Sequence, residues 1–452
     1  MSFLKNSSES KKFYKSLFHV VGPLAIQNLI SAAVGTADVV MLGYVNQTAI
    51  AATSLAGNIQ FLLFMVTTGL SSGLVMLAAQ YWGKQDTLSI QTLHGIALRI
   101  SAAFGLVFAG AAIFTPELLM KIFTEEVQLI EAGSKYLRIT GISYLFFAVS
   151  QIFQAAFKSI ERVKIVTVIT TTALLLNIFL NAVFIFGLFS APKLGIAGVA
   201  LATTISRTIE LFMCLAYAKT QNDINFSLSN VLKFNRVLTF DFIKFSLPAL
   251  GNELVWGSAF SMYSVILGHL GEDIVAANSV VNVLRQLCSV LAFGMAYGGA
   301  IVLGKTIGSG NLELAERDAS RLVRSTILAG FCASIFLILF KPVLPLFAQL
   351  SPAASHFRDM LVYINSLSVF GAAVNTVLIC GVFRSGGDSK FGFILDSIIM
   401  WLVSVPIGLF AAFVLKLPPL WVYFILYLDE FEKMPAAVIH YLKKTWLKNI
   451  TR

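Results

Sequence analysis

The sequence predicts an all-α polytopic membrane protein. We expect twelve transmembrane helices in two six-helix bundles, an N-lobe and a C-lobe, related by a pseudo-twofold axis around a central cleft. Of the 452 residues, 57% are hydrophobic and only 12% are charged, which is about half the charged fraction of an average soluble domain. Apolar runs of about 18 residues or more recur along the chain, and a bilayer core takes about 20 helical residues. These runs lack the two-residue alternation of a membrane β-barrel.

The apolar runs place twelve spans. They are expected at residues 17–43, 52–82, 89–114, 130–156, 164–190, 195–218, 241–268, 274–305, 319–340, 357–382, 390–415 and 418–437. The last span is the least apolar, because Asp429, Glu430 and Glu432 lie within it. The spans divide the chain into a cytoplasmic N-terminal segment (1–16), the N-lobe (17–218), a cytoplasmic linker (219–240), the C-lobe (241–440) and a basic cytoplasmic tail (441–452).

Basic residues collect in alternate loops. One set of loops and ends contains, among others, Lys15, Lys84, Lys164, Arg236, Lys305, Arg384, Lys390 and Lys448. The other set is short and sparsely basic. Because Lys and Arg accumulate in cytoplasmic loops, this pattern predicts that both termini face the cytoplasm. It also accounts for the net charge of +10 without a nucleic-acid partner.

The chain repeats itself at an offset of 225 residues. Pro23 corresponds to Pro248 and Gly83 to Gly308, while IAATS at 50–54 corresponds to VAANS at 275–279. Each half holds six spans, so the halves have the same orientation and are related by an axis along the membrane normal. Two such bundles are suited to alternating access.

Three carboxylates fall inside predicted spans: Asp38, Glu253 and Asp396. An ionised side chain at the bilayer centre costs about 2.5–3.5 kcal/mol on insertion scales. The cost falls if the group faces a wet cavity, pairs with a cation or is protonated. A coupling-ion site uses all three of these conditions. The alternative for each carboxylate is a fixed interhelical ion pair or a position near a helix end.

Two arginines also lie in predicted spans. Arg207 and Glu210 are three residues apart and share a helix face, which favours an internal salt bridge. Arg285 could neutralise Glu253 on the neighbouring helix, or it could determine which substrate charge the cavity accepts. The residues do not decide between these two roles.

Amides and prolines mark further positions inside the spans. Asn177 and Asn181 are four residues apart and point the same way, so they either hold helices together or line a cation site. Pro23 and Pro248 lie in the first third of equivalent helices, where each removes a backbone hydrogen bond and permits a bend. A moving part in each bundle and simple packing are both compatible with such a bend.

Several motifs resemble the multidrug and toxic compound extrusion (MATE) family, bacterial type. They include GPLAIQNLISAAVGTADVVMLGYV, LPALGNELVWGSAFSMYSVILGHLGEDIVAANS and GVFRSGGDSKFGFILDSIIMWLVSVP, and they occur in the family's order and spacing. The resemblance implies a multi-pass protein of a bacterial inner membrane. It also implies a secondary antiporter that exports amphipathic, often cationic, organic compounds in exchange for H⁺ or Na⁺, with no other cofactor. We expect the antiporter to act as a monomer.

The resemblance extends to individual residues. Asp38 is similar to the family's N-lobe proton or cation site, Glu253 to its C-lobe glutamate, and Asp396 to an acidic position after the FRSGGD segment; Na⁺ could bind at Glu253 and Asp396. Asn181 stands where some members have an aspartate, so a purely N-lobe proton mechanism is not implied. The secondary candidates for lining the cavity are Gln27, Asn28, Asn177, Asn181, Tyr263 and Arg285. At the 225-residue offset of the repeat, Asn28 corresponds to Glu253, and Tyr263 corresponds to Asp38.

Other functions remain as alternatives. A lipid or lipid-linked precursor flippase of the same superfamily is the nearest. A membrane-embedded enzyme is disfavoured, because the sequence shows no metal-ligand spacing or catalytic triad. A channel is disfavoured by the internal duplication with charges at mid-membrane. We therefore expect a carrier and not an enzyme.

Overall fold

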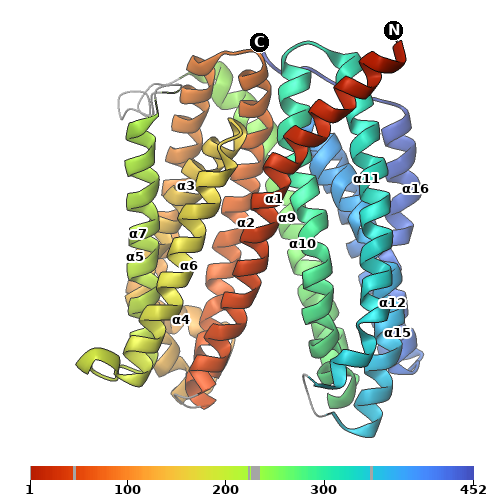
Figure 1. The fold of residues 1–452 in the computed structure, drawn as a ribbon. Helices are drawn as coiled ribbons and strands as arrows, with labels where there is room; N and C mark the ends of the chain where they lie inside the picture. The colour runs from red at the N-terminus through yellow and green to blue at the C-terminus, as the bar shows by residue number, and fades with distance from the viewer. Residues whose placement is uncertain (1, 44–46, 222–223, 225–234, 347–349) are drawn as a thin grey trace. The chain divides into compact units, whose positions relative to one another are not determined.

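The computed structural model describes the chain apart from residues 1, 44–46, 222–223, 225–234 and 347–349. It also leaves the side chains of 2–8, 32, 35–40, 42–43, 47 and 346 undescribed. Throughout the described ranges the regular structure is helical and contains no β-strand (Figure 1). The all-α class predicted from the sequence is confirmed.

The helices follow the predicted spans closely. The first half contains α1 (Ser2–Gly43), α2 (Gln47–Gly83), α3 (Thr87–Phe114), α4 (Pro116–Lys121), α5 (Val127–Ser159), α6 (Val163–Phe186), η1 (Leu188–Ser190) and α7 (Ile196–Thr220). The second half contains α9 (Arg236–Gly268), α10 (Glu272–Gly308), α11 (Leu312–Leu339), η2 (Lys341–Leu346), α12 (Pro352–Thr376), η3 (Val377–Phe383), α13 (Ser389–Asp396), η4 (Ser397–Ser404), α14 (Val405–Leu409), η5 (Phe410–Val414), α15 (Pro419–Leu426) and α16 (Asp429–Leu442). Among the described residues, nine helical stretches are long and apolar enough to cross a membrane.

The twelfth expected span, 418–437, is not one helix. α15 ends at Leu426, and α16 begins at Asp429 after a short break. The acids that reduce the hydropathy of this span lie in the first turn of α16, where the positive end of the helix dipole stabilises negative charge. The expected span 418–437 is therefore divided into two helices, and the second of them continues to Leu442.

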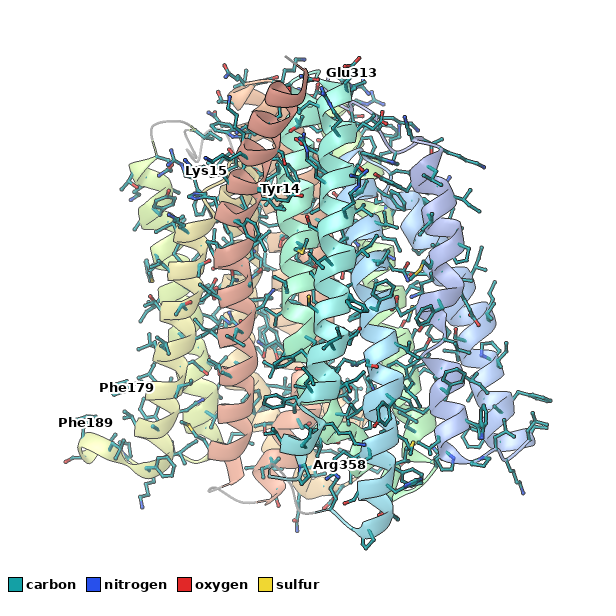
Figure 2. The ribbon with its side chains drawn as sticks, turned by 45° about the vertical axis from the view of Figure 1, so that its right-hand side comes forward. Tyr14, Lys15, Phe179, Phe189, Glu313 and Arg358 are labelled. Carbon is teal, nitrogen blue, oxygen red and sulfur yellow. The ribbon has the colours of Figure 1, made fainter. Side chains whose placement is uncertain are left out.

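The first helix starts earlier than expected. α1 is helical from Ser2, although the sequence suggested a start at 17. Phe13 and Leu17, four residues apart, are buried, and the hydroxyl of Ser325 on α11 donates to that of Tyr14 at 3.3 Å. Figure 2 shows Tyr14 on this part of α1. An apolar stripe at helical spacing thus continues the helix beyond the membrane span.

The chain forms two compact units. Unit 1 comprises residues 1–25, 79–84 and 247–452, and unit 2 comprises residues 26–78 and 85–246. The core of unit 1 is an apolar cluster that includes Tyr263, Leu284 and Tyr423. Unit 2 has two apolar clusters, one around Leu63 and Tyr144 and another around Phe157 and Cys214. The linker expected at 219–240 lies largely outside the described residues.

Two glycines related by the internal repeat lie at one helix crossing in unit 1. A Cβ atom on Gly83, at the end of α2, would lie 1.9 Å from the carbonyl oxygen of Lys305. A Cβ atom on Gly308, at the end of α10, would lie 1.9 Å from the carbonyl oxygen of Gln80. Only glycine permits backbones to approach this closely at both positions. The contact is reciprocal, as a local twofold relation between the repeats requires.

Candidate functional site

Glu253, the carboxylate of the LPALGNELVWG motif, is paired with an arginine. It lies on α9 with its side chain 12% exposed, and Arg384 Nη1 donates to its Oε1 at 2.9 Å. Arg384 follows η3, and its side chain is 4% exposed. Close packing of α9 on α13 supports this position, since a Cβ atom on Gly251 would lie 2.8 Å from the ring of Phe393. The charge at Glu253 is therefore compensated within the protein.

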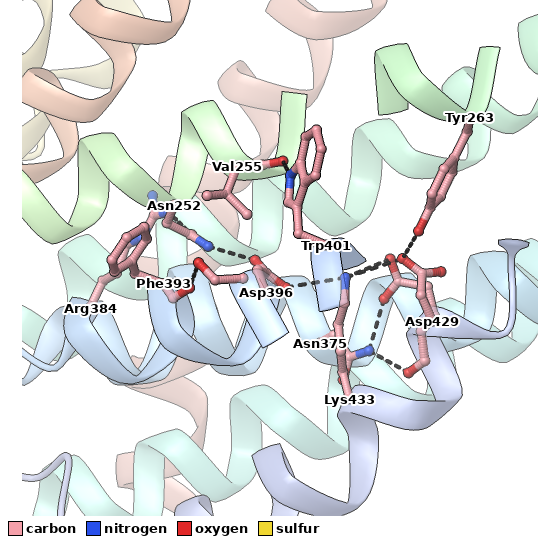
Figure 3. A network of polar contacts seen from close by, with 12 residues as sticks. Asn252, Val255, Tyr263, Asn375, Arg384, Phe393, Asp396, Trp401, Asp429 and Lys433 are labelled. Atoms are coloured by element: carbon pink, nitrogen blue, oxygen red, sulfur yellow. Dashed lines mark hydrogen bonds and ion pairs between the residues drawn. The ribbon is translucent and has the colours of Figure 1, made fainter. Parts of the chain in front are cut away.

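Asn252 connects this pair to the second predicted carboxylate. Its Oδ1 accepts from Arg384 Nη2 at 2.7 Å, and its Nδ2 donates to Asp396 Oδ2 at 2.5 Å. Figure 3 shows the amide between the arginine and the aspartate. Glu253 and Asp396 are thus brought into one network, although they are 143 residues apart.

A buried lysine continues the network from Asp396. The Nζ atom of Lys433 on α16 lies 3.1 Å from Asp396 Oδ1, 3.3 Å from Asp429 Oδ2 and 3.9 Å from Glu430 Oε1. The side chains of Lys433 and Asp429 are 2% and 1% exposed. Buried charges of this kind require partners, because leaving water is costly for each of them.

Neutral donors complete the outer side of the network. The hydroxyl of Tyr263 donates to Asp429 Oδ2 at 3.3 Å. Asn375 Nδ2 donates to Glu430 Oε2 at 2.8 Å and to its carbonyl oxygen at 2.6 Å. Tyr263 is 1% exposed and is therefore part of this buried network.

Irregular helix geometry surrounds the network. η3 and η4 are π-helical segments; η3 ends directly before Arg384, and η4 begins directly after Asp396. π-helical turns inside α-helices are frequent at functional sites. Here they flank two of the charged residues.

Arg285 has a different environment from the one the sequence suggested first. Its guanidinium lies over the rings of Phe260 and Tyr427, at 5.4 and 5.1 Å from their centroids. The cation paired with Glu253 is Arg384. Stacking on two aromatic faces stabilises this partly buried cation through the ring quadrupoles.

In unit 2 the predicted Arg207–Glu210 salt bridge is confirmed. Arg207 Nη1 donates to Glu210 Oε2 at 2.7 Å, and Gln154 Nε2 donates to the other carboxylate oxygen at 2.7 Å. Glu210 is fully buried. A chain of hydrogen bonds continues from Gln154 through Thr170 to Gln27, one of the predicted lining residues.

A polar cavity lies beside this salt bridge. Its volume is about 140 Å³. It is lined by Val34, Gln60, Tyr136, Ala173, Leu174, Asn177, Thr203, Ser206 and Arg207. Asn177 is one of the lining residues, and Asn181 Nδ2 donates to Asn177 Oδ1 at 3.4 Å. The cavity offers several hydrogen-bonding groups and one cation.

The other predicted positions are placed as follows. Asp38 lies on α1, but its side chain is outside the described part of the structure. Asn28 is half-buried on the same helix. Pro23 and Pro248 lie inside the continuous helices α1 and α9.

Sequence reasoning missed two cations of the network, Arg384 and Lys433, and its two amides, Asn252 and Asn375. Arg384 was assigned to a cytoplasmic loop, but it is buried. Lys433 was not singled out, although it stands three and four residues after Glu430 and Asp429, a spacing that favours ion pairing on a helix. That spacing inside an apolar span was the available signal for Lys433.

Long apolar helices with ionic networks buried among them are typical of membrane transport proteins. A family model described as MatE matches residues 23–183 and 248–410. The two matches begin at Pro23 and Pro248, the positions that the internal repeat relates. The chain belongs to the MatE family.

Relatives extend over nearly the whole chain. An uncharacterized transporter of Bacillus subtilis, YisQ, is 23% identical and aligns over 96% of this chain and 95% of its own. A probable multidrug resistance protein of Rhizobium meliloti, NorM, is 23% identical and aligns over 90% of this chain and 87% of its own. The crystal structure of a mutant of the Vibrio cholerae MATE transporter VcmN superposes with a TM-score of 0.88 at 14% identity, covering 97% of this chain and 99% of that one. The predicted family and the twelve-helix, two-lobe fold are thereby confirmed.

Proposed function

We propose that this transporter is a secondary active antiporter that exports amphipathic, often cationic, organic compounds by alternating access, in exchange for an ion. The observation that carries the proposal is the continuous buried network from Glu253 through Arg384, Asn252 and Asp396 to Lys433. Buried charge of this extent is expensive in a membrane protein and marks ion or substrate pathways. The probable multidrug resistance relatives support the choice of substrate class.

The network suits coupling because its charges are near to one another in a medium of low dielectric constant. Neutralising one carboxylate by an ion or a proton removes its attraction for the cation beside it and leaves that cation to its other acids, and the effect is large because Coulomb interactions are strong where water is excluded. The contacts join α9, the segment after η3, α13 and α16. A change of charge at Glu253 or Asp396 therefore reaches several helices of unit 1. In the N-terminal half, Asp38 is the proposed acid.

The test is efflux of ethidium from cells that lack their own multidrug pumps. Cells expressing the wild type should expel ethidium, and both Glu253→Gln and Asp38→Asn should slow the initial rate about tenfold, corresponding to about 1.4 kcal/mol in the barrier. Efflux unchanged in both variants, at equal amounts of protein in the membrane, would refute the proposal.

A matched control keeps the chemistry of the substitution constant. Glu313 is an exposed carboxylate in the first turn of α11, and Figure 2 shows it at the N-terminal end of that helix. Glu313→Gln should leave ethidium efflux unchanged. A loss as large as that of Glu253→Gln would mean that the assay responds to net charge and not to the network.

A further inference from the structure

Lys433 is enclosed by carboxylates in the way that a bound cation would be. Its ammonium has oxygens of Asp396, Asp429 and Glu430 within 3.1–3.9 Å. These acids come from two helices, α13 and α16. An ammonium is a compact point charge without the planar geometry of a guanidinium. It can therefore occupy a position that would otherwise suit a small monovalent cation.

Each surrounding acid also has its own neutral donor. Asn252 donates to Asp396, Tyr263 to Asp429 and Asn375 to Glu430. These donors fix the carboxylates in place independently of the lysine. The position between them is thus formed by α9, α12, α13 and α16 together.

The charges around the lysine are not balanced. Glu253 and Arg384 form a neutral pair. Arg285 on α10 interacts electrostatically with Asp429 and Glu430. The other titratable groups that interact with the network or its cations are Tyr263, Tyr297, Cys380, Tyr423 and Tyr427. Three acids therefore face two cations, Lys433 and Arg285. One negative charge remains, and one proton would neutralise it.

We propose that Lys433 is a built-in cation that occupies the place of a coupling ion in the C-terminal half and excludes Na⁺ from it. The inference rests on the proposed function of ion-coupled export and adds its ion selectivity. Na⁺ needs several oxygens around it, and here the ammonium already holds them and repels a second cation. A proton needs only one carboxylate oxygen and does not displace the lysine. The C-terminal network is thus coupled to protons, and Lys433 determines this selectivity by position and charge.

Sodium binding to the purified full-length protein tests the proposal without transport. Thermal unfolding is measured in increasing NaCl against choline chloride of equal ionic strength, and a shift is attributed to the network only if Asp396→Asn abolishes it. The wild type should show no such shift. Lys433→Ala, which removes the ammonium and leaves space among the three carboxylates, should show a saturable rise in melting temperature with Na⁺. Lys433→Arg keeps the charge and should remain insensitive.

The outcomes separate clearly. A network-dependent Na⁺ shift in the wild type would overturn the proposal, and so would a folded Lys433→Ala variant that does not respond to Na⁺. If the alanine variant does not accumulate, Lys433→Gln takes its place with the same expectation. Absence of ethidium efflux would refute the proposed function, whereas these binding results concern Lys433 alone.

Discussion

Arg384 and Glu253 form an ion pair at 2.9 Å, and both side chains are largely buried. The glutamate that stands alone in an apolar stretch of sequence therefore has a fixed partner 131 residues away. The same arginine donates to Asn252, the residue directly before the glutamate. Arg384 thus positions two adjacent residues of α9, and the carboxylate is both compensated and oriented.

Arg384→Gln should strongly destabilise the protein. Removing one partner of a buried ion pair leaves the other charge without compensation, which typically costs about 3–5 kcal/mol. The double variant Glu253→Gln, Arg384→Gln should lose less stability than the sum of the single variants, since no charge remains unpaired. Thermal unfolding in detergent measures all three.

The control for this prediction is an exposed ion pair of the same type. Arg138 and Glu117 are 57% and 48% exposed, and such pairs contribute about 0–1 kcal/mol. Arg138→Gln should therefore unfold close to the wild-type temperature. If Arg384→Gln and Arg138→Gln lowered the unfolding temperature equally, the buried Arg384–Glu253 pair would contribute no more to stability than an exposed pair.

Gly83→Ala should disrupt the crossing of α2 and α10. The added methyl would lie 1.9 Å from the carbonyl oxygen of Lys305, so the helices must move apart. Overpacking of this kind costs about 1–3 kcal/mol or more. Gly57 lies on the same helix with nothing within 4 Å of the equivalent atom. Gly57→Ala should unfold at or above the wild-type temperature, because alanine favours helix over glycine.

Ala173→Leu should be tolerated, whereas Ala200→Leu should not. Ala173 lines the cavity of about 140 Å³ in unit 2, so a larger side chain has space to occupy. Ala200 is fully buried in an apolar cluster of the same unit, where three extra carbon atoms should cost about 1–3 kcal/mol. Comparison of the two melting temperatures measures the difference. A severe loss of stability for Ala173→Leu would mean that the cavity does not accept a side chain.

The sequence was sufficient to predict the fold class and most of the long helices. Long apolar runs and the repeat at 225 residues do not depend on tertiary contacts, so most of the long helices match their predicted spans to within about seven residues, the early start of α1 at Ser2 being the main exception. The spacing of Arg207 and Glu210 on one helix face was likewise enough to predict their salt bridge. Local periodicity carries this information.

Partners from distant segments could not be predicted in the same way. Arg384 is near a polar SGGD turn and resembles a cytoplasmic loop residue, and only the three-dimensional structure shows that it is buried beside Glu253 of α9. Lys433 and its acids lower the hydropathy of the last span, which made that span appear weak. The same residues are the centre of the network once α13 lies next to α16. A single sequence does not specify which distant helices meet.

Gln80→Leu should release the C-terminal strap, which we define as residues 443–452. The Gln80 side chain is fully buried; its Nε2 donates to the carbonyl oxygens of Ser385 and Lys448, and its Oε1 accepts from the amide of Ile450. Leucine keeps the volume but leaves these three groups unpaired, at about 1–3 kcal/mol for each buried group. The variant should lose its last residues to carboxypeptidase faster than the wild type, and its melting temperature should fall.

Gln128 is exposed on α5, so Gln128→Leu should match the wild type in both measurements. Unchanged digestion of the Gln80→Leu variant would show that the other contacts of the strap, such as the buried Trp446 and the hydrogen bond from Asn449 to Ile307, hold it without Gln80.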